Sequence, residues 1–375
     1  MLPAALLQSL ADIPGFDAAA FEAVHAAGAP PVSIRLNPGK QPAGDPGWEF
    51  GSQVPWCPYG RYLPSRPSFT LDPLLHAGAY YVQEASSMFL WHIFQQLAGA
   101  DTKKKLLDLC GAPGGKSTLI ASYFRDGLVV TNEVIKQRAQ VLVENITKWG
   151  GDNTIVTNND PSHFKSLPGY FDILVADAPC SGSGLFRKDP DAISEWSEDN
   201  VALCSQRQQR ILADALPALK ADGFLVYCTC SYSVEEDEAI GNWLVNEMDM
   251  EGIRIPLNAD WGIVETSLYP GSYGYRFYPD RVKGEGFFAA VFRKRSESTG
   301  RFKEQSLAMA TKQELQQLFS FITIPEAFSF FRSAESIRAI RTEWLNALRE
   351  LAGSLYIKKA GVEIGSIKGR DIVPS

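Results

Sequence analysis

Two cysteines follow apolar, strand-like runs in this sequence. Cys180 lies in the run DAPCSGSG (residues 177–184), directly after the apolar residues 173–176. Cys230 ends the β-branched and aromatic residues 223–230, in the run CTCS. Open α/β sheets bind their ligands at the carboxyl ends of their strands, so we expect both thiols at one ligand-binding edge. A thiol in such a place can act as a covalent nucleophile.

The other cysteines are interpreted as packing residues. The chain has six cysteines and no C-x-x-C pair, so the pattern favours neither a disulfide framework nor a zinc ribbon, and we expect no metal site. The period of a strand puts Cys228 and Cys230 on one face, with Cys230 at the tip. We interpret Cys228, Cys57, Cys110 and Cys204 as small packed side chains.

A glycine-rich turn is the second candidate site. The run DLCGAPGGKS (residues 108–117) follows an apolar segment and opens a helical pattern. A Walker A loop would need a glycine at Cys110, and the G-x-G-x-x-G dinucleotide fingerprint is absent. A plain strand-to-helix turn would leave Asp108 and three glycines without a purpose. The turn therefore predicts a ligand that approaches backbone amides without a dedicated phosphate cradle.

Acidic residues after the next two strands indicate what that ligand is. Glu133 lies 25 residues beyond Asp108, where folds of this kind place a ribose-binding acid. Asn159 and Asp160 end the following strand, where a polar pair could hold an adenine edge. A cofactor with an adenosine but no phosphate suits this set, so we expect S-adenosylmethionine.

These motifs are embedded in an alternation of strand and helix patterns. Strands are expected at residues 106–110, 128–134, 154–157, 172–176, 223–230 and 286–292, and helices at 117–123, 135–149, 200–219 and 234–245. The last of these helices would carry the acidic residues 235–238 in its first turn, which suits the helix dipole. The alternation predicts an α/β protein with a doubly wound, mostly parallel, Rossmann-like sheet.

Three regions are expected along the chain. Residues 1–80 are expected to be a small N-terminal α+β domain that binds RNA or substrate, with helical spacing over 2–25 and a proline-rich stretch of loops and short strands over 29–67. Residues 81–296 are the catalytic domain. Residues 297–375 are a C-terminal appendage, with helices at 312–320 and 333–351 and the start of a strand-rich unit at 355–367. This appendage is either a module that is cut short or a naturally small unit.

Composition excludes several classes of protein. The 375 residues are 45% hydrophobic and 21% charged, unlike disordered, collagen-like or coiled-coil chains. The apolar runs fall far short of the roughly 20 residues of a membrane span, and no basic stretch of a secretory signal begins the chain. We expect a cytoplasmic protein without a membrane partner. The net charge of -7 argues weakly against nucleic acid, but it divides into -10 up to residue 300 and +3 beyond it.

The motifs together resemble the Sun family of RNA (cytosine-5) methyltransferases, in particular its bacterial RsmF-like branch. The resemblance covers about residues 35 to 294. It rests on the runs RLN (35–37), YVQEASSM (81–88), DLCGAPGGKS (108–117), DAPCSGSG (177–184), FRKDP (186–190) and TCS (229–231). It implies the fold of S-adenosylmethionine-dependent methyltransferases and methyl transfer to C5 of an RNA cytosine.

The resemblance also implies roles for individual residues. A thiolate that adds to C6 of cytosine makes C5 nucleophilic, and the thiol is expelled after methylation. By position, Cys230 is the nucleophile, Cys180 assists product release, and Asp177 could hydrogen-bond the base. The residues implied to hold the cofactor are Cys110, Gly111, Ala112, Pro113, Gly114, Gly115, Lys116, Glu133, Arg138, Asp160 and Asp177. Those expected near the RNA are Lys188, Arg207 and Arg276.

The implied partner is RNA. Small-subunit ribosomal RNA, free or within the subunit, is the first expected substrate and tRNA the second, with the target base unpaired or flipped out. Aromatic residues at 56–62 and 277–278 could stack bases or pack in the core. Residues 355–370 resemble the leading part of a PUA-like RNA-binding module. We expect a monomer.

Two other classes of function stay open. A methyltransferase acting on a protein or small molecule would have no evident use for both thiols. A catalytically silent RNA-binding module is disfavoured by the intact Cys180 and Cys230.

Overall fold

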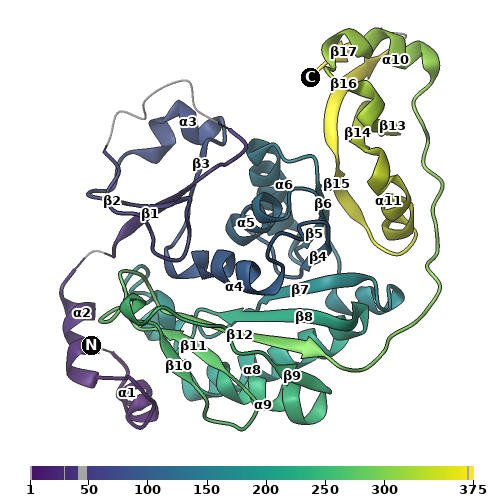
Figure 1. The fold of residues 1–375 in the computed structure, drawn as a ribbon. Coiled ribbons are helices and arrows are strands. Elements are labelled where there is room, and N and C mark those ends of the chain that lie inside the picture. Colours follow the sequence, from purple (N-terminus) through teal and green to yellow (C-terminus); the bar gives the residue numbers. More distant parts are fainter. Residues whose placement is uncertain (1, 29, 41–48, 370) are drawn as a thin grey trace.

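The structure of the chain is a computed structural model that describes residues 2–28, 30–40, 49–369 and 371–375. Parts of two predicted segments, residues 29 and 41–48 of the proline-rich stretch and Arg370 of the PUA-like stretch, lie outside these described residues. Figure 1 shows a large central sheet with a small sheet on either side of it.

The central sheet is mostly parallel. Its parallel strands run in the order β8 (Leu219–Thr229), β7 (Phe171–Asp177), β4 (Lys105–Asp108), β5 (Leu128–Asn132) and β6 (Thr154–Thr157). At one side, β12 (Phe287–Lys294), β11 (Gly274–Phe277) and β10 (Val264–Thr266) extend it antiparallel, and β9 (Met250–Gly252) pairs with β12. At the other side, β15 (Ile357–Ala360) pairs antiparallel with β6. The expected doubly wound sheet is confirmed.

Neighbouring residues of each strand point to opposite sides of the sheet. Because consecutive residues of the parallel strands are apolar, both faces of the sheet are apolar. Leu106 packs with the face covered by α4 (Leu90–Leu97), α5 (Gly115–Tyr123) and α6 (Lys136–Trp149). Leu107 packs with the opposite face, which α8 (Glu198–Ala215) and α9 (Glu238–Glu247) cover. The polar ends of the strands are thus held by a core on each side.

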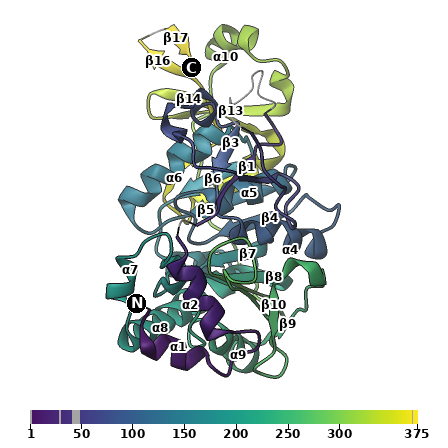
Figure 2. The same ribbon diagram turned by 90° about the vertical axis from the view of Figure 1, so that its left-hand side faces the viewer.

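The N-terminal region consists of a helical part and a small sheet. Helices α1 (Ala4–Leu10) and α2 (Ala18–Ala26) precede the antiparallel sheet of β2 (Gly60–Leu63), β1 (Val32–Leu36) and β3 (Tyr80–Val82), and α3 (Pro73–His76) precedes β3. Phe21 of α2 packs against Tyr232 and Tyr278, which lie in loops of the catalytic region. The two ends of the chain lie at opposite ends of the molecule in both views (Figures 1 and 2).

The C-terminal region corrects one expectation. Residues 336–341, expected to be helical, form β14 (Ser336–Arg341), which pairs with β13 (Phe328–Ser333) and β16 (Val362–Lys368), and β17 (Asp371–Pro374) completes this sheet. Pairing overrides the local pattern because Ile337 and Ala339 fill a small core with Leu318. The helices of this region are α10 (Lys312–Leu318) and α11 (Leu345–Ala352).

The regional boundaries stay a prediction. Strand β3 crosses the expected boundary at residue 80, and β15 carries the expected appendage into the central sheet. Among the described residues, no helix combines the length and apolarity needed to cross a membrane. The remaining short helices are α7 (Ala192–Glu195) and the 3-10 turns Phe69–Leu71, Ser86–Phe89, Pro161–Ser166, Ser183–Leu185, Leu216–Ala218, Ala259–Trp261, Phe319–Phe321, Pro325–Ala327 and Thr342–Trp344.

Candidate active site

The predicted site residues gather at the carboxyl ends of the parallel strands. We call residues 108–117, between β4 and α5, the cofactor turn. We call residues 177–184, after β7, and residues 229–237, after β8, the two thiol loops. Because β4, β7 and β8 are neighbours in the sheet, their carboxyl ends bring the turn and both loops to one edge.

The cofactor turn is a close-packed backbone structure. Gly114 has a φ of +118°, which side-chain-bearing residues rarely adopt, and α5 begins at the next residue. A Cβ on Gly111 would lie 2.0 Å from Oγ1 of Thr131. Asp108 is fully buried and accepts a hydrogen bond of 2.5 Å from Oγ of Ser117. Burial raises the pKa of Asp108 to about 7, although the bond from Ser117 opposes the shift.

Glu133 is tied to the cofactor turn through Arg138. The Glu133 side chain is buried, and its Oε1 accepts from the backbone N–H of Ile135 at 2.9 Å. Its Oε2 lies 3.3 Å from Nη1 of Arg138, whose Nη2 donates to the carbonyl oxygen of Ala112 at 3.0 Å. The predicted ribose-binding acid therefore has a fixed place beside the turn.

Asp160 caps a short helix at the end of the next strand. Its Oδ1 accepts from the backbone N–H and from Oγ of Ser162, at 3.0 and 2.7 Å. These hydrogen bonds lower the pKa of Asp160. The preceding Asn159 contacts the backbone of Tyr356 in both directions, since its Oδ1 accepts from the N–H and its Nδ2 donates to the carbonyl. The C-terminal region thus reaches this corner of the site.

Lys116 and Asp177 join the cofactor turn to the first thiol loop. Nζ of Lys116 lies 2.7 Å from Oδ2 of Asp177. Burial disfavours the lysine charge, but the neighbouring carboxylate outweighs burial and raises the pKa of Lys116.

The two predicted reactive thiols lie side by side. The Sγ atoms of Cys180 and Cys230 are 3.1 Å apart, whereas Cys228 is fully buried, as interpreted from the sequence. The hydrogen bond with Cys230 and burial raise the pKa of the Cys180 thiol well above its usual range. The backbone of Gly184 packs closely beside the second thiol loop, since a Cβ added there would lie 2.8 Å from the carbonyl oxygen of Cys230. Two such thiols can divide nucleophilic attack and release between them.

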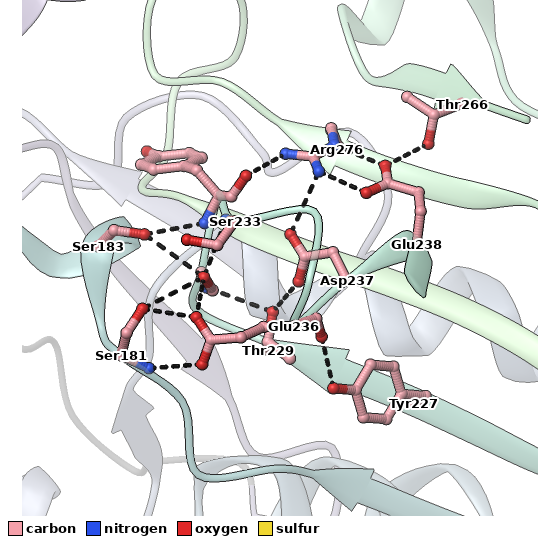
Figure 3. Close-up of polar contacts among 12 residues, drawn as sticks. Ser181, Ser183, Tyr227, Thr229, Ser233, Glu236, Asp237, Glu238, Thr266 and Arg276 are labelled. Atoms are coloured by element: carbon pink, nitrogen blue, oxygen red, sulfur yellow. Dashed lines mark hydrogen bonds and ion pairs between the residues drawn. The ribbon is translucent and has the colours of Figure 1, made fainter. Parts of the chain in front are cut away.

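A cluster of buried carboxylates lies at the end of the second thiol loop and the start of α9, as Figure 3 shows. The acidic residues 235–238 were expected in the first turn of a helix, but α9 begins only at Glu238. Glu236 and Asp237 precede the helix and are fully buried, and their side chains bond to the loops instead. Glu236, Asp237 and Glu238 are therefore buried internal residues, whereas Glu235 is exposed.

Arg276 belongs to this cluster, which corrects its expected place at the RNA. Its side chain is 1% exposed and donates to both oxygens of Glu238, while Asp237 lies 3.6 Å away. Its Nη1 donates to the carbonyl oxygen of Tyr232 at 2.8 Å. A guanidinium enclosed in this way compensates buried charge and offers no surface to a phosphate.

The other expected RNA contacts fall into two groups. Lys188, after the first thiol loop, and Arg207, on α8, are exposed. Four of the aromatic side chains considered for base stacking are buried in the core, in agreement with the alternative of ordinary packing; they are Trp56, Tyr62, Phe277 and Tyr278. The fifth, Tyr59, is half-buried and packs against the ring of Trp91.

Three polar residues of the site escaped the sequence reasoning. Gln208 of α8 donates to the carbonyl oxygen of Pro179 and to Glu236. Arg35 of β1 donates to the carbonyl oxygen of Gly115 in the cofactor turn. The sequence did contain one indication of the role of Glu236. A serine follows each of the two cysteines, and two serine hydroxyls at neighbouring loops can share one acceptor.

Comparisons with known proteins agree with this geometry. Residues 95–293 match the family model described as 16S rRNA methyltransferase RsmB/F, and residues 2–85 match the N-terminal domain of 16S rRNA methyltransferase RsmF. A ribosomal RNA small subunit methyltransferase F of Aliivibrio fischeri is 36% identical over 266 residues, which are 69% of this chain and 55% of that protein. The chain spans about half the length of the curated relatives it matches.

Solved structures show the same fold. A methyltransferase homologue from Pyrococcus horikoshii superposes with a TM-score of 0.60 and 28% identity, over 78% of this chain and 100% of that one. The structure of NSun6 from Pyrococcus horikoshii with SFG gives a TM-score of 0.65 at 18% identity, over 79% of this chain and 99% of that one.

Proposed function

We propose, because the chain belongs to the RsmB/F family of 16S rRNA methyltransferases, that it transfers a methyl group to C5 of a cytosine in small-subunit ribosomal RNA. The observation that carries the proposal is the pair of thiols, 3.1 Å apart, beside a glycine turn at the ligand-binding edge of the sheet. A methyltransferase for protein or small molecules would need neither the second thiol nor its position.

The residues at the cofactor turn fit S-adenosylmethionine. The close backbone at Gly111 and Gly114 leaves amides free of side chains, and the buried Glu133 offers a carboxylate at the place of a ribose. Asp160 and the backbone of residues 110–115 complete the proposed binding residues, with Arg138 holding Glu133 in place. Lys116 and Asp177 form the side of the site that faces the thiol loops. When bound, this cofactor supplies an electrophilic methyl group on a sulfonium sulfur.

The two thiols then have distinct tasks. The thiolate of Cys230 adds to C6 of the cytosine and forms a covalent adduct, and the electron pair of the broken C5–C6 π bond makes C5 nucleophilic. After methylation, C5 loses its proton to solvent and the bond between C6 and Sγ of Cys230 breaks. Cys180, whose raised pKa keeps it a neutral thiol, donates a hydrogen bond to the departing sulfur and stabilises its charge. Asp177 is a proposed hydrogen-bond partner of the base.

The RNA side of the proposal rests on exposed cations near the thiol loops. Lys188 and Arg207 are exposed and can neutralise phosphates. Arg276, by contrast, could do so only by leaving the buried Glu238 unpaired. The excess of basic residues beyond residue 300 adds a second basic region in the C-terminal part of the chain. We predict that the enzyme acts as a monomer in the cytoplasm. The need for two reduced thiols supports the cytoplasmic location.

Methyl incorporation tests the proposal. The protein is incubated with methyl-labelled S-adenosylmethionine and, in separate reactions, 16S rRNA, assembled small subunits and tRNA. We expect label in 5-methylcytosine of 16S rRNA or of the subunit, and no label with Cys230→Ala. Cys180→Ala should accumulate an RNA–protein adduct that survives a denaturing gel.

Cys204→Ala is the matched control, because Cys204 is buried on α8 outside the thiol loops. It should keep full activity and accumulate no adduct. Incorporation that persists in Cys230→Ala would remove the assigned nucleophile, and label found only in tRNA would move the substrate to the alternative class.

A further inference from the structure

Glu236 contacts the residue that follows each reactive cysteine. Its Oε1 accepts from the backbone N–H of Ser181 at 2.7 Å, and its Oε2 accepts from Oγ of Ser181 at 2.5 Å. The same Oε2 accepts from Oγ of Ser231 at 2.6 Å. Figure 3 shows the carboxylate of Glu236 reaching toward Ser181. One carboxylate therefore joins the two thiol loops immediately beside Cys180 and Cys230.

Further contacts fix the orientation of this carboxylate. Nε2 of Gln208 lies 3.3 Å from Oε1 of Glu236 and donates to the carbonyl oxygen of Pro179, the residue before Cys180. The hydroxyl of Tyr227 donates to the backbone carbonyl of Glu236 at 2.6 Å. Because Glu236 is fully buried, the donors on Ser181, Ser231 and Gln208 replace the water that its carboxylate would otherwise bind.

We propose that Glu236 is a positioning residue that holds the two thiols at their working separation and thereby controls both adduct formation and release. Glu236 belongs to the second thiol loop, and its bonds from Ser181 of the first loop fix the relative position of the two loops. Its bond from Ser231 holds the same carboxylate beside Cys230. The catalytic consequence rests on the proposed function, whereas the separation of the thiols can be measured without any methyl transfer.

Charge gives Glu236 a second effect on the pair. Its negative charge is one of the causes that raise the pKa of Cys180, after the hydrogen bond that Cys180 donates to Cys230, burial and the charge of Cys230. Burial likewise raises the pKa of Glu236, and the bonds from Ser181 and Ser231 oppose this. Geometry and charge can be separated by substitution, since Glu236→Gln keeps the length of the side chain and Glu236→Ala removes both.

Thiol–disulfide exchange measures how well the loops hold the pair together. The two sulfur atoms must approach from 3.1 Å to about 2.05 Å to bond. The folded protein is equilibrated with mixtures of reduced and oxidised glutathione, and peptide mass spectrometry quantifies the Cys180–Cys230 disulfide. In the overall reaction two protein thiols are oxidised, one disulfide forms, and one oxidised glutathione is reduced to two thiols. The glutathione ratio at half-conversion gives the effective concentration of the pair.

We expect this effective concentration to fall at least tenfold in Glu236→Ala and by less in Glu236→Gln and Ser231→Ala. Glu235→Ala is the matched control, because Glu235 is the adjacent acid and its side chain is exposed. Thermal melting of each reduced variant checks its fold. If Glu236→Ala does not fold, Glu236→Gln and Ser231→Ala carry the test.

Kinetics then test the catalytic consequence. In the active protein we expect Glu236→Gln to lower kcat about tenfold or more with little change in KM, while Glu235→Ala changes neither. Folded variants that keep the effective concentration of the wild type would overturn the positioning role, as would a wild type in which the pair never forms a disulfide. If the exchange responds as expected but no RNA is methylated, the proposed function fails and the positioning of the thiols stands.

Discussion

Two buried arginines anchor the two halves of the site by different means. Arg35, from the N-terminal sheet, holds the cofactor turn: it donates to Gln83, to Oγ1 of Thr118 and to the carbonyl oxygen of Gly115, all neutral acceptors. Arg276, from β11, supports the thiol loops through the carboxylates of Glu238 and Asp237. Both arginines are fully or almost fully buried, so exposure does not distinguish them.

The electrostatic consequences are opposite. Burial lowers the pKa of Arg35 to about 10, its hydrogen-bond partners among the described residues are neutral, and its guanidinium lies over the ring of Trp149 at 4.5 Å. At Arg276 burial acts in the same direction, but Glu238 outweighs it and raises the pKa. Removing Arg35 leaves neutral groups behind, whereas removing Arg276 leaves buried negative charge. The cofactor half should therefore tolerate change better than the thiol half.

The largest effect is expected for Arg276→Met. Loss of the guanidinium leaves Glu238 and Asp237 buried without a counter-charge, a situation that costs about 3–5 kcal/mol. Urea unfolding followed by circular dichroism measures the loss. The double variant Arg276→Met with Glu238→Gln should recover part of it, and a double variant no more stable than the single one would contradict the charge argument.

A smaller effect is expected for Arg35→Met. The lost hydrogen bonds leave neutral acceptors, which costs about 1–3 kcal/mol in the same unfolding experiment. Because Arg35 contacts Gly115 in the cofactor turn, this variant should also weaken binding of S-adenosylmethionine in calorimetry. A loss of stability as large as that of Arg276→Met would erase the difference between the two halves.

The pH dependence of stability sharpens the comparison. In the cofactor half, the buried carboxyl of Asp108 is hydrogen-bonded to the hydroxyl of Ser117 and not to an arginine. The folded protein binds the proton of Asp108 up to a pKa of about 7, whereas an unfolded aspartate releases it near 3.8. Stability contributed by this group therefore falls as pH rises from about 4 to about 7, by at most about 1.4 kcal/mol per pH unit, and is level above that.

Melting curves of wild type and Asp108→Asn across this range measure the effect. The amide does not titrate, so the wild type should lose stability relative to the variant as pH rises. The exposed Asp199→Asn is the control and should follow the wild type. Parallel curves for wild type and Asp108→Asn would show that Asp108 keeps an ordinary pKa.

The smallest structural effect is expected for an exposed cation. Lys188→Ala should change stability by less than about 0.5 kcal/mol. If Lys188 contacts a phosphate, the variant should bind RNA more weakly. The slope of the logarithm of the binding constant against the logarithm of the salt concentration should fall in magnitude by about 1. Filter binding at several salt concentrations measures the slope, and an unchanged slope would remove Lys188 from the interface.

The sequence predicts the parts of the site that local pattern determines. Cys180 and Cys230 follow apolar runs, so the rule that ligands bind at the carboxyl ends of strands was enough to bring them together. Gly114 and Glu133 follow from the same alternation. These predictions need only strand order and no knowledge of side-chain partners.

The network behind the thiols could not be predicted in this way. Arg276 and Glu238 lie 38 residues apart and meet only because β11 passes the start of α9. Glu236 looked like part of a helix cap because an acidic run before an apolar segment favours that interpretation. The prediction of a helix at residues 336–341 was wrong for a related reason, since pairing with β13 and β16 decides their conformation.

Strand β15 has a consequence for the order of folding during synthesis. It pairs Ile357 with Thr157, so the last neighbour of β6 is made 200 residues after β6 itself. A chain that folds from its N-terminus therefore holds an unpaired sheet edge at β6 while these 200 residues are made, the kind of edge that favours association with other chains. Asn159, beside that edge, receives its Tyr356 contacts only when β15 arrives. A nascent chain can therefore carry both thiols before the contacts that hold Asn159 have formed.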